Sequence, residues 1–171
     1  KYMHELHANE IVLLSYYIAA INIEAVFDEI NGPDHGYKPF EGIVLTDTFE
    51  STERQNTLDD DMFGENDKRL KKQQEVPITA IISNPPYSVG QKNANDDNQN
   101  VHYLKLEEQI EKSYVKQSHS KLSMSVYDSY IKAFRWASDR IKNKGIIGFI
   151  TNNSFLDSNS TDGFRASLYQ E

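Results

Sequence analysis

Two short apolar runs, at 43–45 and 78–82, constrain the fold of this chain more than any other feature. Neither run alternates apolar with polar residues, which is typical of parallel strands that are covered on both faces. Segments with helical periodicity lie between and around these runs. Strands that alternate with amphipathic helices predict an α/β fold with a mostly parallel, doubly wound sheet.

The helices are bounded by recognisable start and stop signals. The first has an apolar stripe that we expect to pack on a sheet, and a polar stretch at 51–75 holds a second helical candidate. The stripe consists of Ile11, Leu14, Ile18, Ile21 and Ala25, with a stop at Asn31-Gly32-Pro33. The other expected helices are Asn66 to Gln74, Leu104 to Tyr114, Tyr127 to Ile141 with a stop at Asn143 and Gly145, and one that starts near Thr161 or Asp162.

The tetrapeptide Asn84-Pro85-Pro86-Tyr87 follows the second apolar run and indicates chemistry on an amino group. An exocyclic amine such as adenine N6 is a poor nucleophile, and two hydrogen-bond acceptors can draw it towards tetrahedral geometry. The side-chain carbonyl of Asn84 and the backbone carbonyl of Pro85 suit this task, because successive prolines hold the backbone rigid. Tyr87 offers a face on which an extruded base could stack. The plain alternative is a proline-rich turn at a strand end.

This tetrapeptide resembles motif IV of the S-adenosylmethionine-dependent N6-adenine DNA methyltransferases. The resemblance implies a Rossmann-like methyltransferase core, with Asn84, Pro85, Pro86 and Tyr87 as catalytic residues. Protein-glutamine and some RNA methyltransferases carry the same motif, so a glutamine amide or an RNA base is an alternative acceptor.

Two acidic positions resemble the cofactor motifs of that family. Glu10 matches the acid of motif II, which would accept the ribose hydroxyls of S-adenosylmethionine. Asp47 matches motif III, where it would accept from the cofactor's adenine amine while Phe49 packs on the ring. The alternatives are that Glu10 only opens a helix and that Asp47 is a helix cap or turn residue. We expect Glu10, Asp47 and Asn84 to face one shared cavity above the strand ends.

The amino-acid sequence of several other segments is similar to the methylase part of large single-chain type ISP restriction-modification enzymes. In these enzymes a helicase and a methylase share one polypeptide. These segments are 8–11, 88–92, 127–130 and 144–156. The family's motif I, a glycine-bearing turn that approaches the cofactor, is expected upstream of Glu10. We therefore interpret residues 1–171 as the central part of one methyltransferase catalytic domain, without its first strand, and we expect this piece alone to be inactive.

The segment at 88–121 is rich in Asn, Gln, Asp and Lys. Long polar connections in compact domains are often functional lids. We interpret this segment as a mobile loop over the active site.

Charge and composition exclude some classes of function for this piece. The net charge of −8 argues against a DNA clamp, because phosphate contacts need Lys or Arg. DNA contact is therefore expected to come from domains outside this segment, with helicase or nuclease domains as further neighbours. The chain has no cysteine, its five histidines lack a ligand spacing, and no segment is apolar enough to span a membrane, so we expect no metal and a cytoplasmic location.

The leading hypothesis is transfer of a methyl group from S-adenosylmethionine to adenine N6 in DNA by the intact parent protein, as the modification part of a restriction system. The second keeps the chemistry and changes the acceptor to a glutamine amide or an RNA base. The third is a non-catalytic scaffold that retains the fold.

Overall fold

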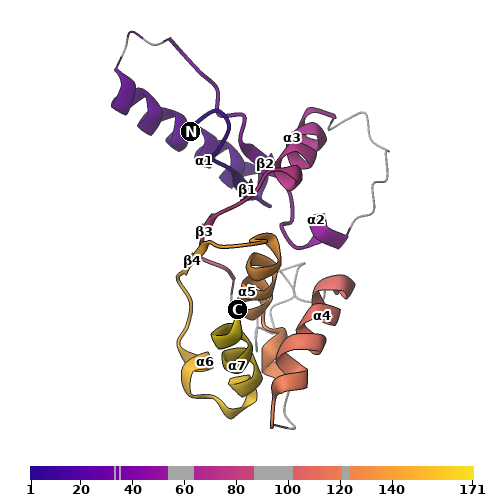
Figure 1. Cartoon of the computed structure of the whole chain (residues 1–171). Coiled ribbons are helices and arrows are strands. Elements are labelled where there is room, and N and C mark those ends of the chain that lie inside the picture. Colours follow the sequence, from indigo (N-terminus) through magenta and orange to yellow (C-terminus); the bar gives the residue numbers. More distant parts are fainter. Residues whose placement is uncertain (33, 35, 54–63, 87–101, 121–123) are drawn as a thin grey trace. The chain divides into compact units, whose positions relative to one another are not determined.

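The computed structural model describes residues 1–32, 34, 36–53, 64–86, 102–120 and 124–171. These form two compact units, residues 1–76 and 77–171, and each is described by itself. Each unit contains one pair of parallel strands together with helices (Figure 1). The parallel pairing predicted from the apolar runs is confirmed. A single doubly wound sheet stays a prediction.

The first unit is built on strands β1 (Ala8–Glu10) and β2 (Ile43–Leu45), which pair with Glu10 opposite Leu45. Ile43 and Val44 are each only 1% exposed, so the expected buried strand is confirmed. Helix α1 (Leu13–Asn31) lies between the strands in sequence, and α2 (Glu50–Glu53) and α3 (Gly64–Glu75) follow β2.

Helix α1 ends where the sequence predicted, because Gly32 adopts a positive φ of 78° and its N–H donates to the carbonyl of Asp28 at 2.9 Å. The predicted stripe is not covered, however, and Leu14 and Ile21 are more than 60% exposed. The helix is longer than the strands on which its apolar stripe was expected to pack. A 19-residue helix is about 28 Å long, whereas three-residue strands extend only about 10 Å.

The second unit pairs β3 (Ala80–Ser83) with β4 (Ile146–Phe149) in parallel, with Ser83 opposite Phe149. The expectation that the run at 78–82 is covered on both faces is wrong. Along β4 exposed and half-buried residues alternate, whereas in β3 only Ile81 is half-buried and the other three residues are exposed, Ile82 to 88%. Phe149 packs against Phe134 of α5 (Ser129–Arg140), with ring centroids 4.9 Å apart. The helices therefore cover one face of this pair.

The helices of the second unit hold its core. Helix α4 (Leu104–Ile110) continues as a π-helical turn at Glu111–Val115, which confirms the helix expected there. Short helical turns at Met124–Tyr127 and Asn159–Thr161 flank α5 and α6 (Ser154–Asp157), and α7 (Asp162–Gln170) closes the unit as predicted. The buried rings of Tyr114 and Phe164 meet edge to face at 5.0 Å.

Glycine at position 163 permits the close packing of α7 on the π-helical turn. A Cβ atom at Gly163 would lie 2.0 Å from the carbonyl oxygen of Tyr114 and 2.6 Å from the backbone nitrogen of Ser118. Both contacts are to backbone, which cannot rotate away as a side chain could. Only glycine fits this contact.

Candidate functional site

Glu10 and Asp47 lie at the same edge of the first unit. Glu10 ends β1, and its carbonyl accepts from the N–H of Thr46, at 2.8 Å, just beyond the end of β2. Asp47 is the next residue. Because the strands are parallel, both acids belong to the carboxyl edge of the pair, where open α/β folds bind ligands.

The carboxylate of Glu10 is engaged with the start of α1. One of its oxygens, Oε1, accepts from the backbone N–H groups of Ile11 at 3.0 Å and Val12 at 3.2 Å. This is the helix-opening role that the sequence left open for Glu10. The contact also fixes the direction of the side chain at the strand end.

The carboxylate of Asp47 also closes a local turn. Its Oδ1 accepts from the N–H groups of Phe49 at 2.9 Å and Glu50 at 3.2 Å, so that it caps the short helix α2. The structure therefore realises the alternative predicted for Asp47. Phe49 is half-buried beside this turn. Cofactor contacts by Glu10, Asp47 and Phe49 stay predictions.

The residues at this edge fit the nucleoside part of a methyl-donor cofactor. Asn9 donates from Nδ2 to the hydroxyl of Thr48 at 3.3 Å, which ties β1 to the turn after Asp47. Within the described ranges, Asn9 Oδ1 is buried without a hydrogen-bond partner. Glu10 and Asp47 place two carboxylates, which are hydrogen-bond acceptors, at this edge, whereas the side chain of Asn9, the neighbour of Glu10 in β1, belongs to the other face. Ribose hydroxyls and an adenine amine are donors of the kind that such an edge would bind.

A side chain that the sequence analysis did not single out as functional supports the end of β2. Asn66 of α3 accepts from the N–H of Leu45 at 2.9 Å and donates to the carbonyl of Leu45 at 3.0 Å. The amide thus takes the place of a neighbouring strand along β2. Nothing in the polar stretch around Asn66 distinguishes it from the other polar residues of the helix.

The diproline lies in the second unit, directly after β3. Asn84 and Pro86 are exposed and Pro85 is buried, whereas Tyr87 lies outside the described residues. The strand predicted to precede the motif is present, and its last residue is Ser83. The roles of Asn84, Pro85, Pro86 and Tyr87 remain predictions, as does the cavity shared with Glu10 and Asp47.

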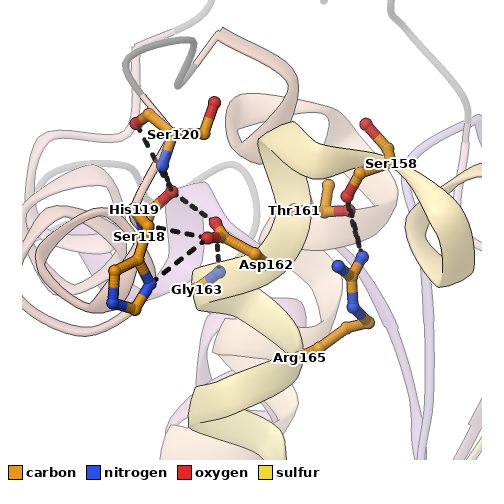
Figure 2. A network of polar contacts seen from close by, with 8 residues as sticks. All are labelled: Ser118, His119, Ser120, Ser158, Thr161, Asp162, Gly163 and Arg165. Atoms are coloured by element: carbon orange, nitrogen blue, oxygen red, sulfur yellow. Dashed lines mark hydrogen bonds and ion pairs between the residues drawn. The ribbon is translucent and has the colours of Figure 1, made fainter.

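The segment predicted as a loop at 88–121 has a helical second half, and residues 88–101 and 121 lie outside the described ranges. The end of that helix is held by Asp162 of α7, whose carboxylate accepts from the Ser118 hydroxyl and from the backbone N–H of His119 at 2.9 Å (Figure 2). The Ser118 hydrogen bond, followed by that of His119, lowers the pKa of Asp162 to about 2. Movement of this segment stays a prediction.

A second anchor stands beside this network. The guanidinium of Arg165 donates to the carbonyl of Ser158 at 2.8 Å and to the hydroxyl of Thr161 at 3.0 Å (Figure 2). It also donates to the carbonyl of Phe155 at 2.6 Å. Arg165 therefore holds the chain that connects α6 to α7.

Two further properties concern the described ranges alone. Of the helices found there, none combines the length and apolarity that a membrane span requires. The same ranges contain no grouping of three or more His, Asp or Glu side chains that could hold a metal ion.

Comparison with known proteins decides the family. Residues 6–171 match the Eco57I restriction-modification methylase family. The chain belongs to this family. An Eco57I-type methylase requires a methyl donor, in agreement with the acceptor-rich edge of the first unit. Comparison with curated proteins finds no match.

Solved structures match this chain along its whole length. A nuclease-deletion mutant of the Type ISP restriction-modification enzyme LlaGI, in complex with a DNA substrate mimic, is 66% identical with a TM-score of 0.93, over 99% of this chain and 14% of that chain. The ATP-dependent Type ISP restriction-modification enzyme LlaBIII bound to DNA is 62% identical with a TM-score of 0.93. The match covers 100% of this chain and 12% of the LlaBIII chain. The matched chain of a DrdV-DNA complex is 42% identical with a TM-score of 0.87. The match covers 99% of this chain and 16% of that chain.

The resemblance to type ISP methylases inferred from the sequence is therefore confirmed. The chain spans about one seventh of the length of the LlaGI chain that it matches.

Proposed function

We propose that the longer protein to which this chain belongs transfers a methyl group from S-adenosylmethionine to N6 of adenine in DNA, as the modification activity of a restriction-modification enzyme. The observation that carries the proposal is Asn84-Pro85-Pro86 at the carboxyl end of a parallel strand in an Eco57I-family methylase. The structure of LlaGI contains a DNA substrate mimic, and that of LlaBIII contains DNA. Both support DNA as the substrate.

In this proposal the first unit binds the cofactor. Glu10 accepts from the ribose hydroxyls, and Asp47 accepts from the adenine amine while Phe49 packs on the ring. The backbone contacts of both acids serve to orient them, since a carboxylate oxygen that already accepts backbone N–H groups is fixed before the ligand arrives. Bound S-adenosylmethionine would supply the methyl group, and its C–S bond breaks as the bond to the amine nitrogen forms.

The second unit binds the acceptor. The target base leaves the duplex at a cost of about a few kcal/mol. Asn84 Oδ1 and the carbonyl of Pro85 then accept one N–H each, so that the nitrogen lone pair is directed at the methyl carbon. The amine loses one proton to solvent after the transfer. Burial of Pro85 limits the movement of its carbonyl, as a preorganised acceptor requires. Tyr87 would stack on the base.

Further domains of the same polypeptide would supply DNA contact, because this chain carries a net charge of −8. The relatives include an ATP-dependent enzyme and a form from which a nuclease was deleted. These features support helicase and nuclease domains in the parent.

The proposal is tested by supplying tritiated S-adenosylmethionine to the intact parent with DNA, RNA and protein in parallel. Label on N6 of adenine in DNA is the expected result. Label on RNA or on a glutamine amide alone would identify a different acceptor. Absence of transfer to all three, together with no cofactor binding, would indicate a scaffold.

A further inference from the structure

The loop after β4 leaves the sheet beside the diproline turn. One hydrogen bond just beyond the paired residues of β3 and β4 joins the N–H of Ile150 to the carbonyl of Ser83 at 3.1 Å. Asn84 is thus opposite Ile150 in a parallel register. Neighbouring strands lie about 5 Å apart, so residues 84–86 and 151–153 leave the sheet at the same edge.

Asn152, in the loop after β4, is half-buried and its side chain is held in one orientation. Its Oδ1 accepts from the backbone N–H of Ser154 at 3.0 Å and from the Ser154 hydroxyl at 2.5 Å. The backbone N–H can only donate, which identifies the oxygen of the amide without ambiguity. The Ser154 hydroxyl lies 3.3 Å from the hydroxyl of Tyr130, which is 2% exposed on α5. The helix layer therefore anchors this amide, and Nδ2 is the atom through which it can bind a ligand.

We propose that Asn152 is a second substrate-binding residue, and that its Nδ2 donates to the ring nitrogen next to the target amine, N1 of adenine. This inference rests on the proposed function. An amine held by Asn84 and Pro85 places its neighbouring ring nitrogen at the same edge of the sheet, and that nitrogen is an acceptor. A donor at N1 draws electron density away from the amine and therefore does not activate it for attack. Asn152 contributes to binding and orientation of the base instead. Its loss is expected to raise KM for DNA more than it lowers kcat.

Asn152→Asp in the intact parent separates this role from a structural one. Aspartate keeps the oxygen that accepts from Ser154 and removes the donor nitrogen. We expect KM for DNA to rise about tenfold or more, with an unchanged melting temperature and unchanged affinity for S-adenosylmethionine. The matched control is Asn153→Ala at the exposed neighbouring residue, which should leave KM unchanged. Wild-type KM in Asn152→Asp would overturn the proposal.

A modified substrate identifies the contacted atom. The target adenine, mapped beforehand in DNA methylated by the parent, is replaced by 1-deazaadenine, in which a C–H stands in place of N1. The substitution also removes the Watson–Crick hydrogen bond at N1, which eases flipping of the base for both proteins alike. The ratio of the Kd for the modified duplex to the Kd for the natural one should therefore be about tenfold larger for wild-type protein than for Asn152→Asp. Equal sensitivity of the two proteins to the substitution would overturn the inference. Loss of methylation in Asn84→Ala, measured alongside, shows whether the proposed function itself holds.

Discussion

The contact between Asn66 and β2 predicts a measurable effect on cofactor binding. Asn66 makes hydrogen bonds of 2.9 and 3.0 Å to the two backbone groups of Leu45, two residues before Asp47. Each bond contributes about 1 kcal/mol net, because water can replace it when it is lost. Asn66→Ala therefore removes about 2 kcal/mol of the free energy that holds the end of β2 in its ordered conformation. If cofactor binding must restore that order, the affinity for S-adenosylmethionine falls about thirtyfold.

The assay is titration calorimetry of S-adenosylmethionine with the intact parent and its variants, after circular dichroism has shown that each variant is folded. Asn66→Asp keeps the acceptor but sets a carboxylate oxygen against the carbonyl of Leu45 in place of the donor, so the affinity should fall by at least about fivefold. Lys68→Ala is the control on the same helix, because its ion pair with Glu65 is exposed and such pairs contribute little. Wild-type affinity in a folded Asn66→Ala protein would refute the reasoning that the edge of β2 positions Asp47.

Two further predictions concern the second unit. Gly163→Ala should destabilise the packing of α7 by about 2 kcal/mol or more, because its Cβ would meet backbone, whereas Gly148→Ala, with its nearest neighbour 3.9 Å away, should be neutral in the same denaturant titration. Asp162 has a lowered pKa of about 2, so its contribution is present above pH 4 and is lost as the pH falls from about 4 to about 2. Hydrogen exchange at the His119 amide should accelerate over that window in wild type and be independent of pH, after correction for intrinsic rates, in Asp162→Asn.

Local patterns predicted the elements well. The apolar run at 43–45 forms strand β2, and the apolar spacing around 131–134 belongs to helix α5. Gly32 marks the end of α1. These features depend on short-range backbone preferences and on periodicity, which a sequence displays directly. Burial was predicted less well, because coverage of Ile21 on α1 or Ile82 on β3 depends on what packs against those faces.

The sequence indicated the two acids and the diproline as candidate site residues, whose roles stay predictions, and it did not indicate the side chains that support them. Glu10 and Asp47 were expected at strand ends, and the parallel register of β1 and β2 confirms their common edge. Asn66 could not be recognised, because a single asparagine in a polar stretch has no pattern around it. Asn152 lies in the segment 144–156 that resembles the family, but nothing in that segment distinguishes its side chain from that of Asn153. Their roles arise from contacts with residues of the fold, such as Leu45 and Ser154.

Asn84→Ala in the intact parent tests the central claim most directly, with tritiated methyl transfer to DNA measured beside calorimetric affinity for S-adenosylmethionine. If Asn84 holds the target amine, transfer is abolished and the affinity stays within about twofold of wild type. Undiminished transfer by the variant would contradict the account.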